Sequence, residues 1–128
     1  MSTLTEEQVD ELHHYKELLT SIEEGFEYIL ASFSDYSKTE GDVILNDIFV
    51  AFNQVILVNA AIQVLFKKDA HMVAAIEDFE EVVSAAEKMD GLFEKSQEKQ
   101  QVVHQTLYPT YKSWFDEIVP LLISKIQH

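Results

Sequence analysis

The feature that most constrains this sequence is an uncharged stretch of nineteen residues, 48–66, which reads IFVAFNQVILVNAAIQVLF. Its length reaches the roughly 18 apolar residues at which a membrane span has to be considered. Four amides interrupt the stretch, and at about 100° per residue they point in several directions, so lipid would leave them unpaired. These amides are Asn53, Gln54, Asn59 and Gln63. A helix apolar on nearly all sides is typical of the centre of a larger assembly. We therefore expect a helix covered by protein, and no contact with a membrane.

Composition limits the remaining classes. A chain of 128 residues is one domain's worth, spanning residues 1–128, and can bury a core without disulfides or metal. The absence of cysteine excludes thiol catalysis, disulfides and cysteine-ligated zinc. The first residues, MSTLTEEQVDE, are acidic where a secretory signal would be basic and then apolar, so we expect a cytoplasmic protein.

The formal net charge is −14, and all nine basic residues are lysine. Without arginine the chain lacks the planar fork that commonly holds phosphates and guanine edges. We therefore expect no nucleic-acid binding.

The N-terminal segment predicts a long amphipathic helix. Thr5 and Gln8 form a capping box, and Leu4 and Val9 are placed to pack together as a hydrophobic staple. Apolar residues then recur at alternating spacings of three and four, as in a coiled-coil seam. They are Leu12, Tyr15, Leu19, Ile22, Phe26, Ile29 and Phe33. Gly25 beside this seam predicts the close approach of a neighbouring helix.

Two further helices follow. Ser37 and Glu40 form a second capping-box candidate for a helix over about 38–67, which closes at two lysines that suit the negative end of its dipole. Asp69 is the expected N-cap of a third helix, and Gly91 the expected left-handed residue after its end, although residues 92–101 could equally continue that helix. Its predicted inner face consists of Met72, Ile76, Phe79, Val83, Ala86 and either Met89 or Phe93.

The last helix carries both prolines. Its predicted inner face consists of Val103, Leu107, Tyr111, Trp114, Ile118 and Leu122. Pro109 and Pro120 lie roughly opposite that face, where they would bend the helix over the core, unless Pro109 begins a fifth helix. The expected fold is all-α, an antiparallel up-and-down four-helix bundle with the last helix kinked or split at Pro109.

One short motif resembles a catalytic one. The segment HHYKELLTSI, residues 13–22, is similar to the phosphoacceptor box of sensor histidine kinases, whose histidine sits on a four-helix module. The resemblance places the phosphorylated histidine at His13 and puts Lys16 where that family has arginine. The sequence departs from the family at His14, which replaces its acid, and at Leu18, which replaces its proline. It also carries no ATP-binding domain. A phosphotransfer module that uses His13 or His14 is therefore the alternative to an exposed histidine pair.

No metal or other cofactor is expected. A carboxylate-bridged di-iron site needs two Glu-x-x-His pairs on different helices, and only Glu11 with His14 fits that spacing. Nucleophile elbows, glycine-rich phosphate loops and H-E-x-x-H are also missing. The chain is therefore predicted to be no enzyme.

Acidic residues concentrate in residues 1–40 and 69–95, and several stand four positions apart, where like charges destabilise a helix. A strongly acidic surface can serve solubility alone, or it can attract a basic protein partner. The candidate partner-binding residues are Glu23, Glu24, Glu27, Glu77 and Glu81. The aromatic group Tyr108, Tyr111, Trp114 and Phe115 fits core packing better than a recognition patch.

The uncharged stretch predicts self-association. An inner seam accounts for Ile48, Phe52, Val55, Ile62 and Phe66. Five further apolar residues remain to be covered: Phe49, Val50, Ile56, Leu57 and Val64. Exposed together they would form a patch of the size that marks an interface, and a two-fold homodimer is the commonest closed solution. The expected function is a small non-enzymatic interaction module, similar in size and composition to small bacterial four-helix proteins such as export chaperones and acidic immunity proteins.

Overall fold

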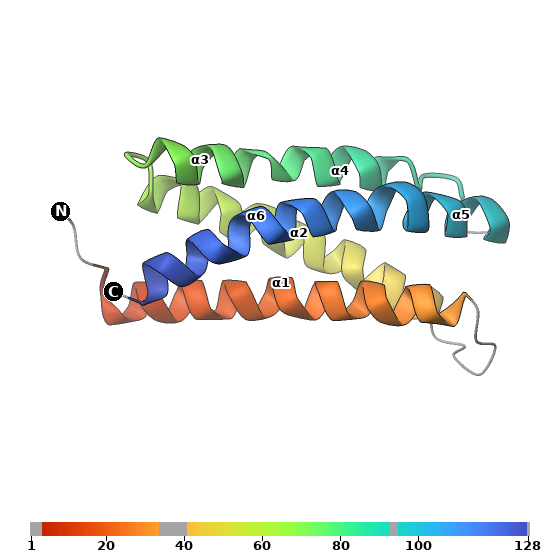
Figure 1. Cartoon of the computed structure of the whole chain (residues 1–128), viewed down its shortest axis with the longest axis horizontal. Helices are drawn as coiled ribbons and strands as arrows, with labels where there is room; N and C mark the ends of the chain where they lie inside the picture. Colours follow the sequence, from red (N-terminus) through yellow and green to blue (C-terminus); the bar gives the residue numbers. More distant parts are fainter. Residues whose placement is uncertain (1–3, 34–40, 93–94, 128) are drawn as a thin grey trace.

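The computed structural model describes residues 4–33, 41–92 and 95–127, and within these ranges it holds helices and no strand. Four helical rods pack against each other (Figure 1). The first is α1 (Glu6–Ser32), the second is α2 (Gly41–Leu65), the third joins α3 (Ala70–Glu77) to α4 (Phe79–Glu87), and the fourth joins α5 (Ser96–Val102), η1 (Val103–Leu107) and α6 (Tyr108–Ile126).

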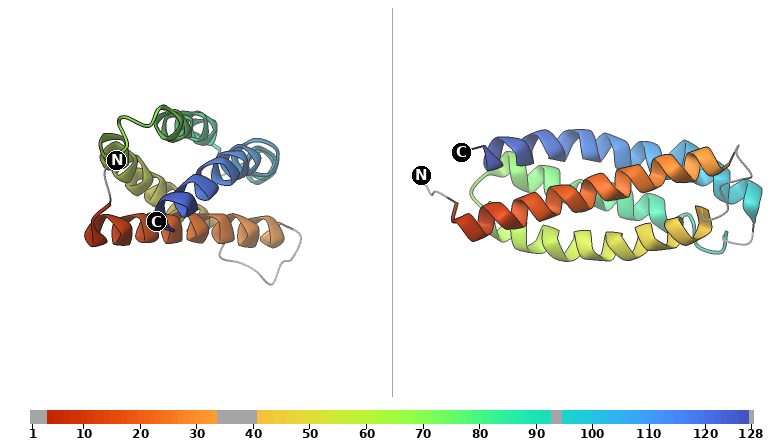
Figure 2. Two further views of the ribbon diagram at one scale, coloured as in Figure 1. Left: turned by 60° about the vertical axis from the view of Figure 1, so that its left-hand side comes forward. Right: turned by 90° about the horizontal axis from the view of Figure 1, so that it is seen from below.

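Successive rods run in opposite directions, so α1 begins and α6 ends at the same end of the bundle (Figures 1 and 2). The first rod contacts α2 and α6, while α3 contacts both α2 and α6. Thus α2 and α6 lie across the bundle from each other. This arrangement confirms the predicted antiparallel up-and-down four-helix bundle.

The start of α1 follows its sequence signals. The Gln8 amide N–H donates to Thr5 Oγ1 at 3.1 Å, and the Thr5 N–H donates to Gln8 Oε1 at 2.8 Å, which completes the capping box. The predicted seam is buried from Leu12 to Ile29, and Phe33 is partly buried at its end. A Cβ atom on Gly25 would lie 3.2 Å from Ile48 Cδ1, so this glycine does permit the close approach of α2.

The second helix, α2, covers Gly41–Leu65 and so ends about two residues before its predicted end near 67. The predicted start near 38 lies outside the described residues. The proposed cap at Ser37 and Glu40 lies outside the described residues. All five residues of its predicted inner seam are buried, from Ile48 to Phe66.

The third rod begins and ends where expected, but its inner face is partly different. Asp69 Oδ1 accepts from the Met72 N–H at 3.1 Å, and Gly91 has a φ of +78°. Val82 and Ala85 are buried where Val83 and Ala86 were predicted, and those two are only partly buried. The next buried residue after Phe79 is three positions later, at Val82, and not four positions later as predicted. The helix is interrupted at Asp78, directly before Phe79. Met89 is buried, whereas Phe93 lies outside the described residues.

The fourth rod is a single curved helix with a π-turn, so Pro109 starts no separate rod (Figure 1). The Tyr108 N–H bonds to the Val103 carbonyl, five residues back, and α6 begins at that point. A proline donates no hydrogen bond, and its ring collides with the carbonyl four residues earlier, so a widened turn accommodates Pro109. All six predicted inner residues are buried, and both prolines are exposed.

Aromatic side chains fill the centre of the core. The Phe26, Phe52 and Tyr111 rings pack with centroids 5.4–6.3 Å apart. The Tyr111 hydroxyl donates to the Leu19 carbonyl at 2.7 Å, and Trp114 Nε1 donates to the Ala75 carbonyl at 2.9 Å. These two aromatic residues are therefore core members, as the sequence favoured.

Candidate functional site

The outward face of α2 is the main apolar surface left uncovered by the bundle. Four of the five predicted interface residues are exposed, and Phe49 is instead partly buried, with its ring 6.0 Å from that of Phe52. Among the residues that the structure describes, the exposed large hydrophobic side chains are Val43 (61%), Val50 (54%), Ile56 (44%), Leu57 (73%) and Val64 (70%). All five belong to α2.

Four of these residues stand seven positions apart, at 43, 50, 57 and 64. We call Val43, Val50, Leu57 and Val64 the α2 stripe. A seven-residue repeat is the period of a coiled-coil seam, and this one extends over roughly 31 Å of helix. Sequence reasoning missed Val43 because it began at the uncharged stretch, although the same spacing continues one heptad earlier.

The four amides of α2 divide between the core and the surface. Asn59 is buried and accepts a hydrogen bond from the Tyr15 hydroxyl, while Gln63 Nε2 donates to Glu77 at 3.0 Å. Asn53 and Gln54 are exposed beside the α2 stripe. Among the described helices, α2 is the one long and apolar enough to cross a membrane, and 28% of its most apolar window is buried in the bundle.

The part of α1 that borders the first half of α2 carries no acid. Residues three or four positions apart share a helix face, and Gly25 faces Ile44 and Ile48 of α2. The residues of α1 that share its face are Glu7, Glu11, His14, Leu18, Ser21, Tyr28 and Ser32. This face of α1 therefore carries no acid or lysine from His14 to Ser32, and its two exposed acids lie in the first turns of the helix.

Across the bundle, acidic side chains of α1 lie against α6. Glu23 Oε1 accepts a hydrogen bond from the Tyr108 hydroxyl at 2.6 Å and lies 4.0 Å from Lys112 Nζ. The charge of Glu23, followed by its hydrogen bond, raises the pKa of Glu27. Burial, followed by the bond to Glu23, raises the pKa of the Tyr108 hydroxyl.

An acidic cleft lies on the other side of α6, against α4. It has a volume of about 290 Å³, and its lining includes Asp78, Glu81 and Glu117. Burial, followed by the hydrogen bond to Asp78, raises the pKa of Glu117. The last helix is therefore flanked by acids on both sides, although its own segment is nearly neutral in charge.

The predicted acidic surface is consequently not one patch. Glu23 and Glu27 lie on the side of α1 that meets α6, Glu81 lines the α4–α6 cleft, and Glu77 bonds to Gln63 of α2. Glu24 is exposed on α1. Most of these carboxylates surround α6, across the bundle from the exposed face of α2.

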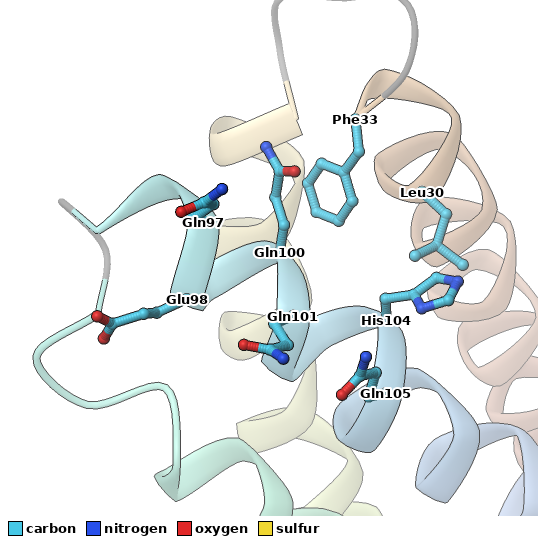
Figure 3. Close-up of a pocket in the computed structure, with 8 residues that line it drawn as sticks. All are labelled: Leu30, Phe33, Gln97, Glu98, Gln100, Gln101, His104 and Gln105. Carbon is cyan, nitrogen blue, oxygen red and sulfur yellow. The ribbon is translucent and has the colours of Figure 1, made fainter.

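A hollow lies where the end of α1 meets α5 and η1 (Figure 3). Its volume is about 600 Å³, and its lining is rich in amides. The lining residues are Leu30, Phe33, Gln97, Glu98, Gln100, Gln101, His104 and Gln105. The His104 ring points toward Leu30, and the Phe33 ring lies beside Gln100. These groups can form hydrogen bonds, but they include no nucleophile paired with a base.

His13 and His14 are both exposed on α1. Within the described ranges, no acid or amide forms a hydrogen bond with either imidazole. In the same part of the chain, no three His, Cys, Asp or Glu side chains are grouped closely enough to hold a metal ion.

Residues 10–117 match a family model described as domain of unknown function DUF8042. The chain belongs to this family. The match spans most of the bundle, so the DUF8042 region contains the α2 stripe and the acids on both sides of α6. No curated protein and no solved structure matches the chain.

Proposed function

We propose that this DUF8042 protein is a non-enzymatic helical interaction module that self-associates through the outward face of α2. The observation that carries the proposal is the α2 stripe, whose four aliphatic side chains are between 54% and 73% exposed. A contiguous apolar surface of this kind marks an interaction site on a water-soluble protein.

If the occupant is a second copy of the chain, the distribution of charge favours contact through the α2 face over contact through α6. Two copies that each carry a formal charge of −14 repel one another, and the acids around α6 would oppose contact on that side. The stripe carries no charge, and the adjoining face of α1 carries no acid from His14 to Ser32, so contact there involves the least repulsion. A two-fold pair would cover the same face on both copies.

The dimensions of the face suit a modest dimer. A stripe about 31 Å long and about 10 Å wide covers on the order of 300 Å² per copy, and the adjoining face of α1 roughly doubles that area. Stable interfaces bury about 800 Å² per partner, so we expect dissociation in the micromolar range. A lipid occupant is disfavoured because Asn53 and Gln54 would enter it unpaired.

Light scattering after size exclusion tests the proposal. At tens of micromolar the wild type should have twice the 14.7 kDa mass of one chain. Leu57→Glu should give a folded protein with the mass of one chain, because a carboxylate in the seam cannot be buried without a partner. Gln97→Glu adds the same charge to exposed α5 and should remain dimeric. A wild-type mass near one chain would contradict the proposal.

The alternative function is a phosphotransfer module. The observation in its favour is that His13 and His14 are exposed on a helix of a four-helix bundle. Incubation with acetyl phosphate and detection of acid-labile phosphoramidate would test it. His13→Gln and His14→Gln would then identify the acceptor.

A further inference from the structure

Resting on the proposed self-association, we infer that the two copies pair with their α2 helices antiparallel, along the α2 stripe. The partner that covers the α2 stripe is thus a second copy of the chain, with its α2 running in the opposite direction. Three features of α2 distinguish the two orientations: the acids that flank the stripe, the lysines just after the helix, and the amides at its centre.

The acids near the start of α2 oppose parallel pairing. Asp42 directly precedes Val43 of the stripe, and Asp47 is four positions after Val43, so the two carboxylates flank the stripe on opposite sides. In a parallel pair, flanking residues of this kind face each other across the seam. Asp42 would then face the partner's Asp47, once on each side of the two-fold axis, and like charges in such positions destabilise the pair.

Antiparallel pairing removes this repulsion and adds attraction. Lys67 and Lys68 are exposed just beyond the end of α2, roughly 30 Å along the axis from Asp47. An antiparallel partner brings its lysines close to the acidic end, twice in each dimer. In a parallel dimer the lysines and the acids would stay at opposite ends of the pair. Their separation of roughly 30 Å exceeds the Debye length of about 8 Å, so salt would screen the attraction between them. In a pair centred on residues 53 and 54, the partner's Lys67 and Lys68 come within about 5 Å of Asp42 along the axis and about 12 Å of Asp47. Asp42, which Lys99 Nζ also contacts at 2.6 Å, therefore receives most of the attraction.

The amides agree with this geometry. Asn53 and Gln54 occupy the midpoint of the stripe between residues 43 and 64, and both are exposed. In an antiparallel pair centred there, Asn53 lies opposite the partner's Gln54, so four amides meet in one layer. An amide both donates and accepts, which allows this layer to pair with itself. A polar layer in an apolar seam also specifies the register of the two helices.

Disulfide trapping tests the orientation, because the native chain has no cysteine and each introduced thiol is unique. Val43→Cys and Val64→Cys lie at opposite ends of the stripe, about 31 Å apart along the helix. A disulfide forms only when the two Cα atoms come within about 7 Å. In the antiparallel dimer, each variant alone should stay uncrosslinked under mild oxidation. A mixture of the two should form a mixed disulfide, identified on a non-reducing gel by a tag on one chain.

The outcomes separate the orientation from self-association itself. Asn53→Cys lies near the two-fold axis and should crosslink to itself in either orientation, so it reports whether α2 meets α2 at all. If Asn53→Cys crosslinks and Val43→Cys also crosslinks with itself, the pairing is parallel and our inference is wrong. If the wild-type mass equals one chain and Asn53→Cys does not crosslink, the self-association proposal has failed as well.

Charge reversal supplies a second readout that needs no thiol. Replacing Lys67 and Lys68 with glutamate should raise the dimer Kd, on the order of fivefold at low salt, if these residues face Asp42 of the partner subunit. In a parallel dimer the lysines of one copy face those of the other. The same change would then replace facing lysines with facing glutamates and should leave the Kd unchanged. An unchanged Kd would therefore contradict the antiparallel orientation.

Discussion

The hydroxyl of Tyr15 donates a hydrogen bond to Oδ1 of Asn59 inside the core, and so joins α1 to α2 across 44 positions of sequence. Tyr15 is 2% exposed and Asn59 is 8% exposed. Burial raises the pKa of the Tyr15 hydroxyl, which therefore keeps its proton and remains a donor. The bond satisfies an amide that would otherwise be unpaired on the inner side of the most apolar helix.

Tyr15→Phe should lower the free energy of unfolding by about 1–3 kcal/mol, because it leaves the buried Asn59 oxygen without its donor. Urea denaturation at one fixed protein concentration would measure the change. The double variant Tyr15→Phe with Asn59→Leu removes both polar groups, and should be less destabilised than the sum of the two single variants. A midpoint unaffected by Tyr15→Phe would show that water replaces the bond.

Gly25→Ala combines a helix gain of about 1 kcal/mol with a tight contact, since the new Cβ would lie 3.2 Å from Ile48 Cδ1. Ile48→Val removes that atom. We therefore expect Gly25→Ala to be more favourable in the Ile48→Val background than in the wild type. Thermal unfolding of the four proteins in this cycle would measure the coupling. If Gly25→Ala changed the stability equally in both backgrounds, the contact with Ile48 Cδ1 would not oppose the new methyl group, and α1 and α2 would move apart at this point at little cost.

Asp69 links the third rod to the end of the fourth. Its Oδ2 lies 2.7 Å from Lys125 Nζ, and this bond, followed by the Met72 N–H, lowers the pKa of Asp69. Asp69→Asn keeps an acceptor for the cap but removes the charge, and should lower stability at pH 7 by up to about 1 kcal/mol. Because the pKa in the folded state is below the unfolded value of about 3.9, this stabilisation is present above that value and is lost as the pH falls through the folded one.

The measurement is the difference in unfolding free energy between wild type and Asp69→Asn from pH 7 to pH 2. It should shrink toward zero in acid. Asp90→Asn, at an exposed position in the turn before Gly91, serves as the control. A stability difference that does not change with pH would mean that Asp69→Asn weakens the hydrogen bond to the Met72 N–H, and that the ion pair with Lys125 contributes little.

Glu27→Gln should stabilise the bundle slightly at neutral pH, because it ends the repulsion by Glu23 that raises the pKa of Glu27. A raised folded pKa means that the wild type loses stability as the pH rises through it, so the advantage of Gln should disappear in acid. The expected increase in Tm at pH 7 is about 1 °C, and added salt should reduce it. A lower Tm for Glu27→Gln would contradict this account.

Much of the fold was predictable because its signals are local. A capping box involves residues three positions apart, and a buried seam repeats every three or four positions, so Thr5, the α1 seam and the inner face of the last helix follow from short spacings alone. The same local pattern was ambiguous at residues 82–86, where Val82 and Val83, and Ala85 and Ala86, are adjacent apolar pairs. Only packing of the third rod on α6 selects Val82 and Ala85 for burial.

The candidate interface was predictable in part. The uncharged stretch identified four exposed residues of α2, but Phe49 packs beside Phe52 and Val43 takes a place in the exposed stripe. The net charge of the last helix also failed to predict the charge of the surface around it. The last helix is nearly neutral, yet Glu23 and Glu81 from neighbouring rods stand beside it.

The sequence by itself determined that this chain forms four amphipathic helices, and that one of them has more apolar surface than a bundle can bury, because periodicity and total hydrophobicity are properties of each segment alone. Only the tertiary structure decided which part of that surface stays exposed. It set the apolar stripe of α2 across the bundle from the acids around α6, because the face each helix turns outward depends on how neighbouring rods pack against it.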